Sequence, residues 1–225
     1  MKSPRVIQVL THSPGTMVGV SLVVVHVIAT LFAPLLIPFE VTKIVGPVLS
    51  SPGSVEHWLG TDNIGRDYLS RLLMGGRTSI FVAMVAITFA IMFASLIAIS
   101  AAYVGGIYDD VVMRIVDTKL AIPGILFIAL IVTGFGRSVP ALILAIALSY
   151  LPGAIRIIRS QALTIIPLGY VDTAKLRGDS LPSIIWKELV PNCQEIIAVE
   201  FALRMSSSIL TVSALSFLGL GISPP

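Results

Sequence analysis

Long uncharged runs of apolar residues recur along this sequence of 225 residues and alternate with shorter polar segments. A helix that crosses a lipid bilayer needs about 20 predominantly apolar residues in succession. On this criterion we expect five spans, at residues 17–39, 78–104, 120–136, 138–155 and 196–220. The pattern therefore predicts an all-α membrane protein with a single transmembrane domain over residues 1–225. Two long polar segments, 40–77 and 156–192, lie between predicted spans.

Two boundaries in this pattern have an alternative interpretation. The first apolar run could begin a signal peptide, but it exceeds the apolar core of about 7–15 residues that signal peptides use, so we expect a retained span. Between the third and fourth spans, Gly134, Gly136, Arg137 and Pro140 favour a tight turn. The alternative there is one continuous helix over residues 120–155.

The composition agrees with the apolar pattern. Hydrophobic residues make up 56% of the chain and charged residues 12%, whereas soluble domains carry about a quarter charged residues. The mean hydropathy is +0.97. These values exclude a water-soluble globular domain. The single cysteine, Cys193, also excludes an intrachain disulfide and a cysteine-based metal cluster.

The distribution of lysine and arginine predicts the orientation, because cytoplasmic loops are enriched in both. With a cytoplasmic N-terminus, the inner segments hold Lys2, Arg5, Arg114, Lys119, Arg156, Arg159, Lys175, Arg177 and Lys187, and the outer segments hold Lys43, Arg66, Arg71, Arg77 and Arg137. Nine cations inside against five outside favour this orientation. Segment 40–77 then lies outside the membrane, and segment 156–192 lies in the cytoplasm.

Sequence motifs for nucleotide binding and catalysis are missing. The chain has no Gly-x-x-x-x-Gly-Lys-Ser/Thr loop, so we expect no ATP site of that type. It has no His-Glu-x-x-His or Gly-x-Ser-x-Gly motif, and His12, His26 and His57 lie far apart in the sequence. His26 falls inside the first predicted span, where an ionisable group is a functional candidate. The alternative is a neutral His26 that bonds to a neighbouring helix.

Glu200 and Arg204 are the charged pair at the start of the last predicted span. Their i, i+4 spacing allows an ion pair on one helix face, which would neutralise two charges near the membrane. The alternative is that both side chains line a transport path.

The inner polar segment carries a candidate docking surface. Residues 170–178 predict a short helix that ends at Gly178, and residues 184–190 predict a second helix that ends at Pro191. Small residues (Thr173, Ala174 and Gly178) would let the backbone of a partner approach closely. Two such helices could dock into a groove of a soluble protein. The alternative is a solvated loop without a partner.

The outer polar segment predicts turns followed by a helix. Gly60, Asp62 and Gly65 are typical turn residues. Arg66, Asp67 and Arg71 then begin a helical segment that leads into the second span. An interfacial turn held by Asp–Arg pairs would account for this pattern.

The inner segment resembles the "EAA" loop of ABC importer permeases. That loop has Glu-Ala-Ala, three further residues and Gly, followed by a stretch that ends near a Leu-Pro pair. The matching residues are Tyr170, Asp172, Thr173, Ala174, Gly178 and Pro191. Asp172 stands in place of Glu and keeps its negative charge. Thr173 stands in place of the first Ala and is also a small residue.

The outer segment resembles the signature before the second span of the dipeptide, oligopeptide and nickel permease family. The matching residues are Gly60, Thr61, Asp62, Gly65, Arg66 and Asp67. Gly105, Asp109 and Asp117 are similar to the first inner loop of that family, and residues 217–225 to the end of its fifth span. The resemblance is greatest to the "C" subunit of the permease pair. Members continue through a sixth span, so we expect that span to be missing here.

The resemblance implies the transmembrane domain of a type I ABC importer in the bacterial inner membrane, with several partners. It implies a heterodimer with a second permease subunit, two cytosolic ABC ATPase subunits on residues 170–191, and an extracytoplasmic solute-binding protein. ATP and magnesium would bind to the ATPase subunits. This chain would bind neither a cofactor nor a nucleic acid. Asp172, Ala174 and Gly178 would couple ATP hydrolysis to transport. The substrate would be dipeptides or oligopeptides, with nickel or a chelated metal as the alternative.

Rival functions from other classes make different demands on the sequence. An ion-coupled secondary transporter or channel would predict paired intramembrane carboxylates or inverted repeats, but Glu200 is the one carboxylate inside the predicted spans. An intramembrane protease would need a Ser–His or Asp–Asp pair at matching depth in two spans. A purely structural membrane subunit is the remaining alternative.

Overall fold

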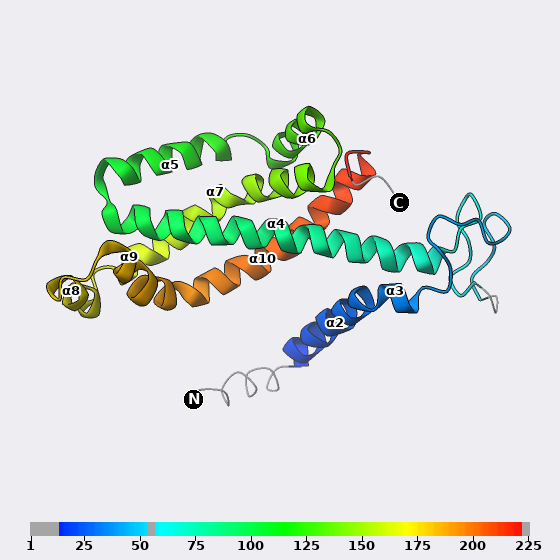
Figure 1. Ribbon diagram of the computed structural model, residues 1–225, viewed down its shortest axis with the longest axis horizontal. Coiled ribbons are helices and arrows are strands. Elements are labelled where there is room, and N and C mark those ends of the chain that lie inside the picture. The colour runs from blue at the N-terminus through cyan, green and yellow to red at the C-terminus, as the bar shows by residue number, and fades with distance from the viewer. Residues whose placement is uncertain (1–13, 54–56, 222–225) are drawn as a thin grey trace. The chain divides into compact units, whose positions relative to one another are not determined.

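The computed structural model describes residues 14–53 and 57–221. In this part of the chain the secondary structure is helical, without a β-strand (Figure 1). The elements are α2 (Pro14–Leu31), α3 (Ala33–Leu36), α4 (Tyr68–Val104), α5 (Gly106–Leu120), α6 (Gly124–Phe135), α7 (Val139–Ile165), α8 (Gly169–Leu176), α9 (Leu181–Ile184), the π-helix η1 (Ile185–Leu189) and α10 (Val190–Phe217). The predicted all-α fold is confirmed. Lys2, Arg5, His12 and residues 222–225, on which the orientation, the histidine comparison and part of the family match depend, lie outside the described residues.

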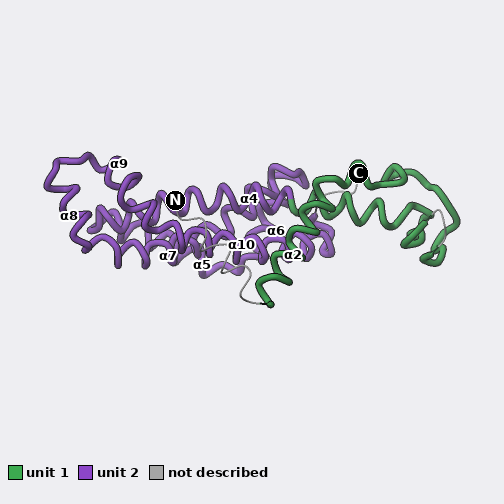
Figure 2. Tube along the Cα trace, turned by 90° about the horizontal axis from the view of Figure 1, so that it is seen from below, with its two compact units in different colours: residues 1–80, 225 green, residues 81–224 purple. Residues whose placement is uncertain are grey.

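The chain forms two compact units, one within residues 1–80 and the other within residues 81–224 (Figure 2). The boundary falls inside α4, so this helix contributes to both units. The first unit also contains α2, α3 and the non-helical outer segment. The second unit contains α5 to α10.

Among the described residues, four helical segments are long and apolar enough to cross a membrane: Pro14–Leu31, Tyr68–Val104, Val139–Ile165 and Leu181–Phe217. A fifth crossing is possible if α5 and α6, which are bent by 87° relative to each other, form one span. Alone, α6 has 12 residues and a length of about 18 Å, which is too short for a hydrocarbon core of about 30 Å. The third predicted span, 120–136, is therefore not a straight helix.

Proline accounts for this bend. Pro123 has no backbone N–H and disfavours helical geometry at the residue before it. As a result, α5 ends at Leu120 and α6 begins at Gly124. The turn expected after the third span is present, because Gly136 adopts a φ of 88° and the Ser138 hydroxyl accepts a hydrogen bond from the Ala141 amide at 3.3 Å.

Several helices extend beyond the uncharged runs that predicted them. Helix α4 begins at Tyr68 rather than near 78, and α7 continues to Ile165 rather than ending at 155. The expected loop at 105–119 is the helix α5. Charge marks where a segment leaves the hydrocarbon, but a helix can continue into the interface and the water beyond it.

Helix α7 is central to the second unit and packs against α5, α6 and α10. Its buried face carries apolar residues at helical spacing, among them Leu142, Ile146, Ile155 and Ile158. Helix α4 contributes a stripe of buried alanines to the same core, at positions 86, 90, 94 and 98. Small residues at such spacing let membrane helices approach closely, so that backbone packing replaces the hydrophobic effect.

Two ion pairs join α5 to α7 in antiparallel order. The Arg159 guanidinium donates to both carboxylate oxygens of Asp109, and Arg156 pairs with Asp117. The Asp109–Arg159 pair is largely buried, with 13% of the Asp109 side chain and 24% of the Arg159 side chain exposed. In the other pair, the Asp117 and Arg156 side chains are 60% and 52% exposed. Both pairs fix the register of α5, but burial makes their energies unequal.

We predict that Asp109→Asn destabilises the protein far more than Asp117→Asn. The first change removes charge-assisted hydrogen bonds from a partly buried arginine, worth about 1.5–3 kcal/mol, whereas an exposed pair contributes about 0–1 kcal/mol. Thermal unfolding of the two variants in detergent measures the difference. Equal shifts of Tm would show that the buried pair does not hold α5 in place.

Candidate functional site

Helix α8 projects at one end of the second unit and ends in a Schellman motif (Figure 1). The Asp179 amide donates to the Ala174 carbonyl at 3.2 Å, and the Gly178 amide donates to the Lys175 carbonyl at 2.9 Å. Gly178 has a φ of 78°, and a Cβ there would meet no atom within 4 Å. The left-handed backbone, rather than lack of space, therefore requires glycine at this position.

The two faces of α8 differ in character. Val171 and Ala174 are fully buried in the core of the second unit, so Ala174, expected to contact a partner, packs against its own chain. Asp172 and Thr173 lie on the exposed face. There the Lys175 ammonium donates to the Asp172 carboxylate at 3.2 Å, and the Thr173 hydroxyl donates to the Gly169 carbonyl at 2.8 Å.

Leu176 is a surface residue that the sequence analysis missed. Its side chain is 89% exposed, although leucine normally lies in a protein interior or in lipid. It follows Asp172 by four residues, so helical spacing places both on the same face. This spacing was the signal in the sequence that could have identified it.

Arg177 connects the turn after α8 to the π-helix η1 through side-chain hydrogen bonds. Its Nη2 donates to Asp179 Oδ2 at 2.8 Å and to Glu188 Oε1 at 3.2 Å. Half-buried Tyr170 packs against the same core. The predicted residues Tyr170, Asp172, Thr173, Ala174 and Gly178 therefore all belong to one short structured segment.

Pro191 does not end a helix, contrary to the sequence prediction. Helical structure continues from Leu181 through η1 into α10. Pro191 has no N–H for the carbonyl four residues earlier, and its ring would clash with that carbonyl in a regular α-helix. The π-helical turn Ile185–Leu189 immediately before it provides the wider backbone that relieves this clash. Consequently α9 and α10 form one continuous structural element.

The outer segment of the first unit folds back on itself in antiparallel order. The Leu49 amide donates to the Asp62 carbonyl at 3.0 Å, and the Val45 amide donates to the Gly65 carbonyl at 2.8 Å. Gly60 and Gly65 have φ values of 77° and 81°. A Cβ would lie 2.2 Å from the Ser50 carbonyl oxygen at Gly60, and 2.5 Å from the Gly46 carbonyl oxygen at Gly65. Both glycines are required for this close approach of the backbone.

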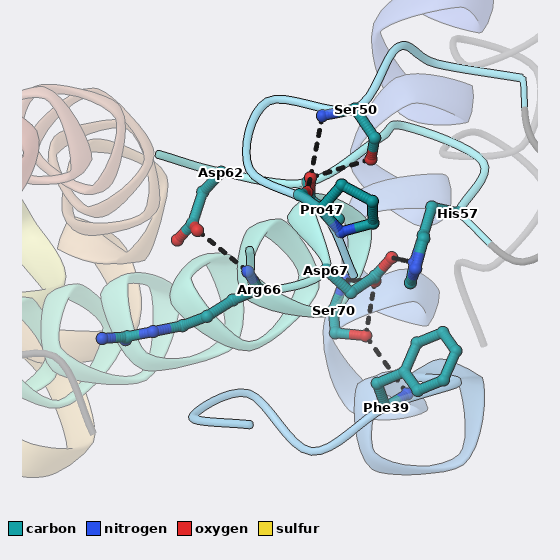
Figure 3. A network of polar contacts seen from close by, with 9 residues as sticks. Phe39, Pro47, Ser50, His57, Asp62, Arg66, Asp67 and Ser70 are labelled. Carbon is teal, nitrogen blue, oxygen red and sulfur yellow. Dashed lines mark hydrogen bonds and ion pairs between the residues drawn. The ribbon is translucent and has the colours of Figure 1, made fainter. Parts of the chain in front are cut away.

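Asp67 is the centre of a polar network at the start of α4 (Figure 3). Its carboxylate accepts hydrogen bonds from the Ser70 amide at 2.8 Å and the Ser70 hydroxyl at 2.7 Å, and lies 3.1 Å from His57 Nδ1. Burial raises the pKa of Asp67, but the hydrogen bonds from Ser70 and His57 outweigh it, so the pKa lies below its ordinary value. Ser70 bonds to Asp67 rather than to His57, so the arrangement is not a catalytic triad.

Asp62 and Thr61 hold the second half of the outer segment. The Asp62 carboxylate accepts the Ile64 and Arg66 amides at 2.9 Å each and pairs with the Arg71 guanidinium. Burial raises the pKa of Asp62, but these hydrogen bonds outweigh burial and lower it. The Thr61 hydroxyl donates to the Pro47 carbonyl.

The predicted Asp–Arg pairing is therefore realised by Asp62 and Arg71. The side chain of Arg66 does not take part, and its Nε has no hydrogen-bond partner among the described residues. The other five residues of the predicted outer signature all shape or hold the turn.

Glu200 and Arg204 form an ion pair on one face of α10. Arg204 Nε donates to Glu200 Oε2 at 2.7 Å, and Glu200 is only 3% exposed. The guanidinium lies so close to Gly153 of α7 that a Cβ there would be 3.1 Å from both terminal nitrogens. The first of the two sequence interpretations thus describes the geometry. His26 Nδ1 lies 2.8 Å from the Leu22 carbonyl oxygen of its own helix, whereas the neutral alternative for His26 placed this bond on a neighbouring helix.

Comparison with known proteins gives the relatives of this chain. Residues 90–225 match the family model described as "Binding-protein-dependent transport system inner membrane component". A dipeptide transport system permease protein of Haemophilus influenzae is 29% identical over 217 residues, covering 94% of this chain and 74% of the relative.

Two further relatives have similar descriptions. A di/tripeptide transport system permease protein of Pseudomonas aeruginosa is 31% identical over 224 residues, covering 97% of this chain and 74% of the relative. A glutathione transport system permease protein of Pectobacterium atrosepticum is 34% identical over 177 residues, covering 79% and 59%.

We predict that Gly60→Ala disrupts the outer segment, whereas Gly53→Ala is tolerated. Both glycines have positive φ (77° and 96°), but only at Gly60 would the new Cβ meet backbone, the Ser50 carbonyl at 2.2 Å. Gly53→Ala should cost about 1–2 kcal/mol for the left-handed backbone alone. Limited proteolysis of the membrane-inserted protein should show faster cleavage within residues 40–67 for Gly60→Ala. Equal cleavage of both variants would refute the steric argument.

Proposed function

Because this chain belongs to the family of binding-protein-dependent transport system inner membrane components, we propose that it is the permease subunit of an ATP-driven importer of dipeptides or oligopeptides. Its fold is the transmembrane domain of a type I ABC importer. It is a multi-pass membrane protein and a component of a transporter rather than an enzyme. The peptide assignment is supported by the relatives described as dipeptide, di/tripeptide and glutathione permeases.

The proposed assembly places this permease in the bacterial inner membrane with its N-terminus in the cytoplasm. A second permease subunit would complete the transport path, and a solute-binding protein would deliver the substrate on the side of the outer segment. Two cytosolic ABC ATPase subunits would bind ATP and magnesium, so this chain would hold no cofactor.

The exposed face of α8 is the observation that supports coupling to an ATPase. Asp172, Thr173 and Leu176 form a surface of one acidic, one small and one apolar side chain, and Val171 and Ala174 fix the opposite face to the core. An exposed apolar residue on a short helix is suited to a pocket in a partner protein. Leu176 is the anchor in this proposal.

Continuity of the helix explains how movement of α8 would reach the membrane. Arg177 joins the end of α8 to Glu188 in η1, and η1 continues into α10. A docked partner drives transport only if its contacts with α8 differ between its nucleotide states. Such a difference would tilt α10 and produce alternating access by rigid-body rocking.

An ion-coupled mechanism has less support in this structure. A proton- or sodium-driven transporter uses intramembrane carboxylates that can change their charge or ligate an ion. Glu200, the carboxylate in the apolar part of α10, is neutralised by Arg204 on the same helix.

The substrate assignment predicts ATP-dependent peptide uptake. Expression of this chain with its second permease, ATPase and binding-protein subunits should restore uptake of a labelled dipeptide in a strain that lacks peptide importers. Uptake should stop when ATP hydrolysis is inhibited with vanadate. Uptake of labelled nickel without dipeptide would refute the peptide assignment and support the metal-transport alternative, and vanadate-insensitive uptake would refute ATP coupling.

The docking assignment predicts that Leu176→Glu weakens ATPase binding by at least about 2 kcal/mol, roughly 30-fold, as for a buried anchor residue. Leu176→Met, which keeps an apolar side chain of similar size, is the matched control. Co-purification of the ATPase with each membrane-inserted variant measures the effect. Substitution of Gly178 by a bulky residue is less informative, because it would also break the left-handed end of α8. Normal co-purification of Leu176→Glu would rule out this surface.

A further inference from the structure

A cleft of about 440 Å³ lies among α4, α5, α6 and α7 in the second unit. Its walls are apolar and include Val112 and Ile115 from α5 and Leu151 and Ile155 from α7. Of the residues that the structure describes, Lys119 is the one charged residue that lines it. The cleft therefore combines an apolar interior with a single cation.

The Lys119 ammonium has weak partners. Its Nζ lies 3.3 Å from the Ser149 carbonyl oxygen and 3.4 Å from the Ser149 hydroxyl, and 4.2 Å from the centre of the Phe127 ring. The described part of the chain places no carboxylate within 4.0 Å of it, because nearby Asp117 pairs with Arg156. An ammonium has three donors, so Lys119 can still take up an anionic group.

A second hollow of about 370 Å³ adjoins the cleft and adds another cation. It is lined by Arg114, Ile115, Thr118, Lys119 and Ile122, and so shares Ile115 and Lys119 with the cleft. Within the described residues Arg114 forms no ion pair either. Two cations therefore flank one end of an apolar space.

The chain also indicates the depth of this site in the membrane. Ser149, which contacts Lys119, lies in the uncharged stretch of α7 that Arg156 ends. Seven residues of helix separate Ser149 from Arg156, about 10 Å along the axis. The site therefore lies in the half of this apolar stretch that is nearer to Arg156 and α8, the side proposed to face the cytoplasm. An unpaired charge at this depth is costly.

We propose that the cleft binds an anionic phospholipid of the cytoplasmic leaflet, with an acyl chain between α5 and α7 and the phosphate at Lys119 and Arg114. Basic pockets between membrane helices on the cytoplasmic side are known to bind anionic headgroups. The proposal depends on membrane insertion and orientation, and not on the transported substrate.

Size and polarity favour a lipid chain over other occupants. A helix 10 Å wide and 18 Å long fills on the order of 1,400 Å³, far more than the 440 Å³ of the cleft. A peptide would bring amide groups that need hydrogen-bond partners, and apolar walls do not supply them. A single acyl chain has no such requirement.

The bound lipid should stabilise the protein, since a ligand that binds only the folded state raises its stability. The full chain is reconstituted in phosphatidylcholine vesicles and in vesicles of phosphatidylcholine and phosphatidylglycerol in equal parts, and Tm is measured. We expect a Tm several degrees higher with phosphatidylglycerol for the natural sequence, a loss of this increase in Lys119→Gln, and its retention in Lys119→Arg. Arg137→Gln is the matched control, because it removes one cation that does not line the cleft and should keep the full response.

Three results would overturn the proposal: no response to phosphatidylglycerol in the natural sequence, an undiminished response in Lys119→Gln, or an equal response to inorganic phosphate, which would indicate a phosphate site without a lipid chain. If Lys119→Gln does not fold, Arg114→Gln is used in its place. Its increase in Tm with phosphatidylglycerol must then be smaller than that of Arg137→Gln. A further result would also overturn the proposal: loss of the response when the second permease subunit is added in both vesicle types, because a protein would then fill the cleft.

Discussion

The cost of an unpaired charge or backbone group in hydrocarbon is the constraint on which the rest of this structure depends. No water is available in the bilayer core, so each segment that crosses it must satisfy its own N–H and C=O groups, and a helix does this locally. Charged side chains then lie beyond the apolar stretches or are neutralised, as Glu200 is by Arg204 one turn later in α10, beside Gly153 of α7. The buried Asp109–Arg159 pair follows the same rule where α5 meets α7.

The same constraint links the membrane helices to the proposed docking surface. A break at Pro191 would leave backbone groups unsatisfied where α10 enters the membrane. The π-helical turn at Ile185–Leu189 avoids that break, and as a consequence α9 and α10 form one continuous helical element. The bent pair α5–α6 is the opposite case, because there the chain does break at Pro123. A continuous helix after α8 and a bend beside the proposed lipid cleft thus arise from two prolines in different surroundings.

Much of the architecture follows from the sequence, as do the positions of the two informative segments. Apolar runs identify α2, α4, α7 and α10, although not the bend between α5 and α6. Gly136 identifies a turn, and the residue pattern at 170–178 identifies α8. The roles of individual residues within 170–178 could not be inferred from the sequence pattern. Ala174 is buried and Leu176 is exposed, and the pattern alone favoured the opposite emphasis. Helical spacing relates residues to one another, but only the packing of α8 decides which face is covered.

The sequence by itself determined that this is a helical membrane protein with a turn-rich polar segment before its second long helix and a short helix at 170–178. These properties depend on local composition. The hydropathy of a segment indicates whether it prefers lipid or water, and a glycine indicates a turn that requires a left-handed backbone conformation. The tertiary structure decided that 106–120 is a helix, that Pro191 continues one, that Arg71 rather than Arg66 pairs with Asp62, and that Lys119 faces an apolar cleft. Each of these depends on contacts between residues distant in the sequence or on competition between nearby partners, and the order of residues along the chain does not specify which contact has the lower free energy.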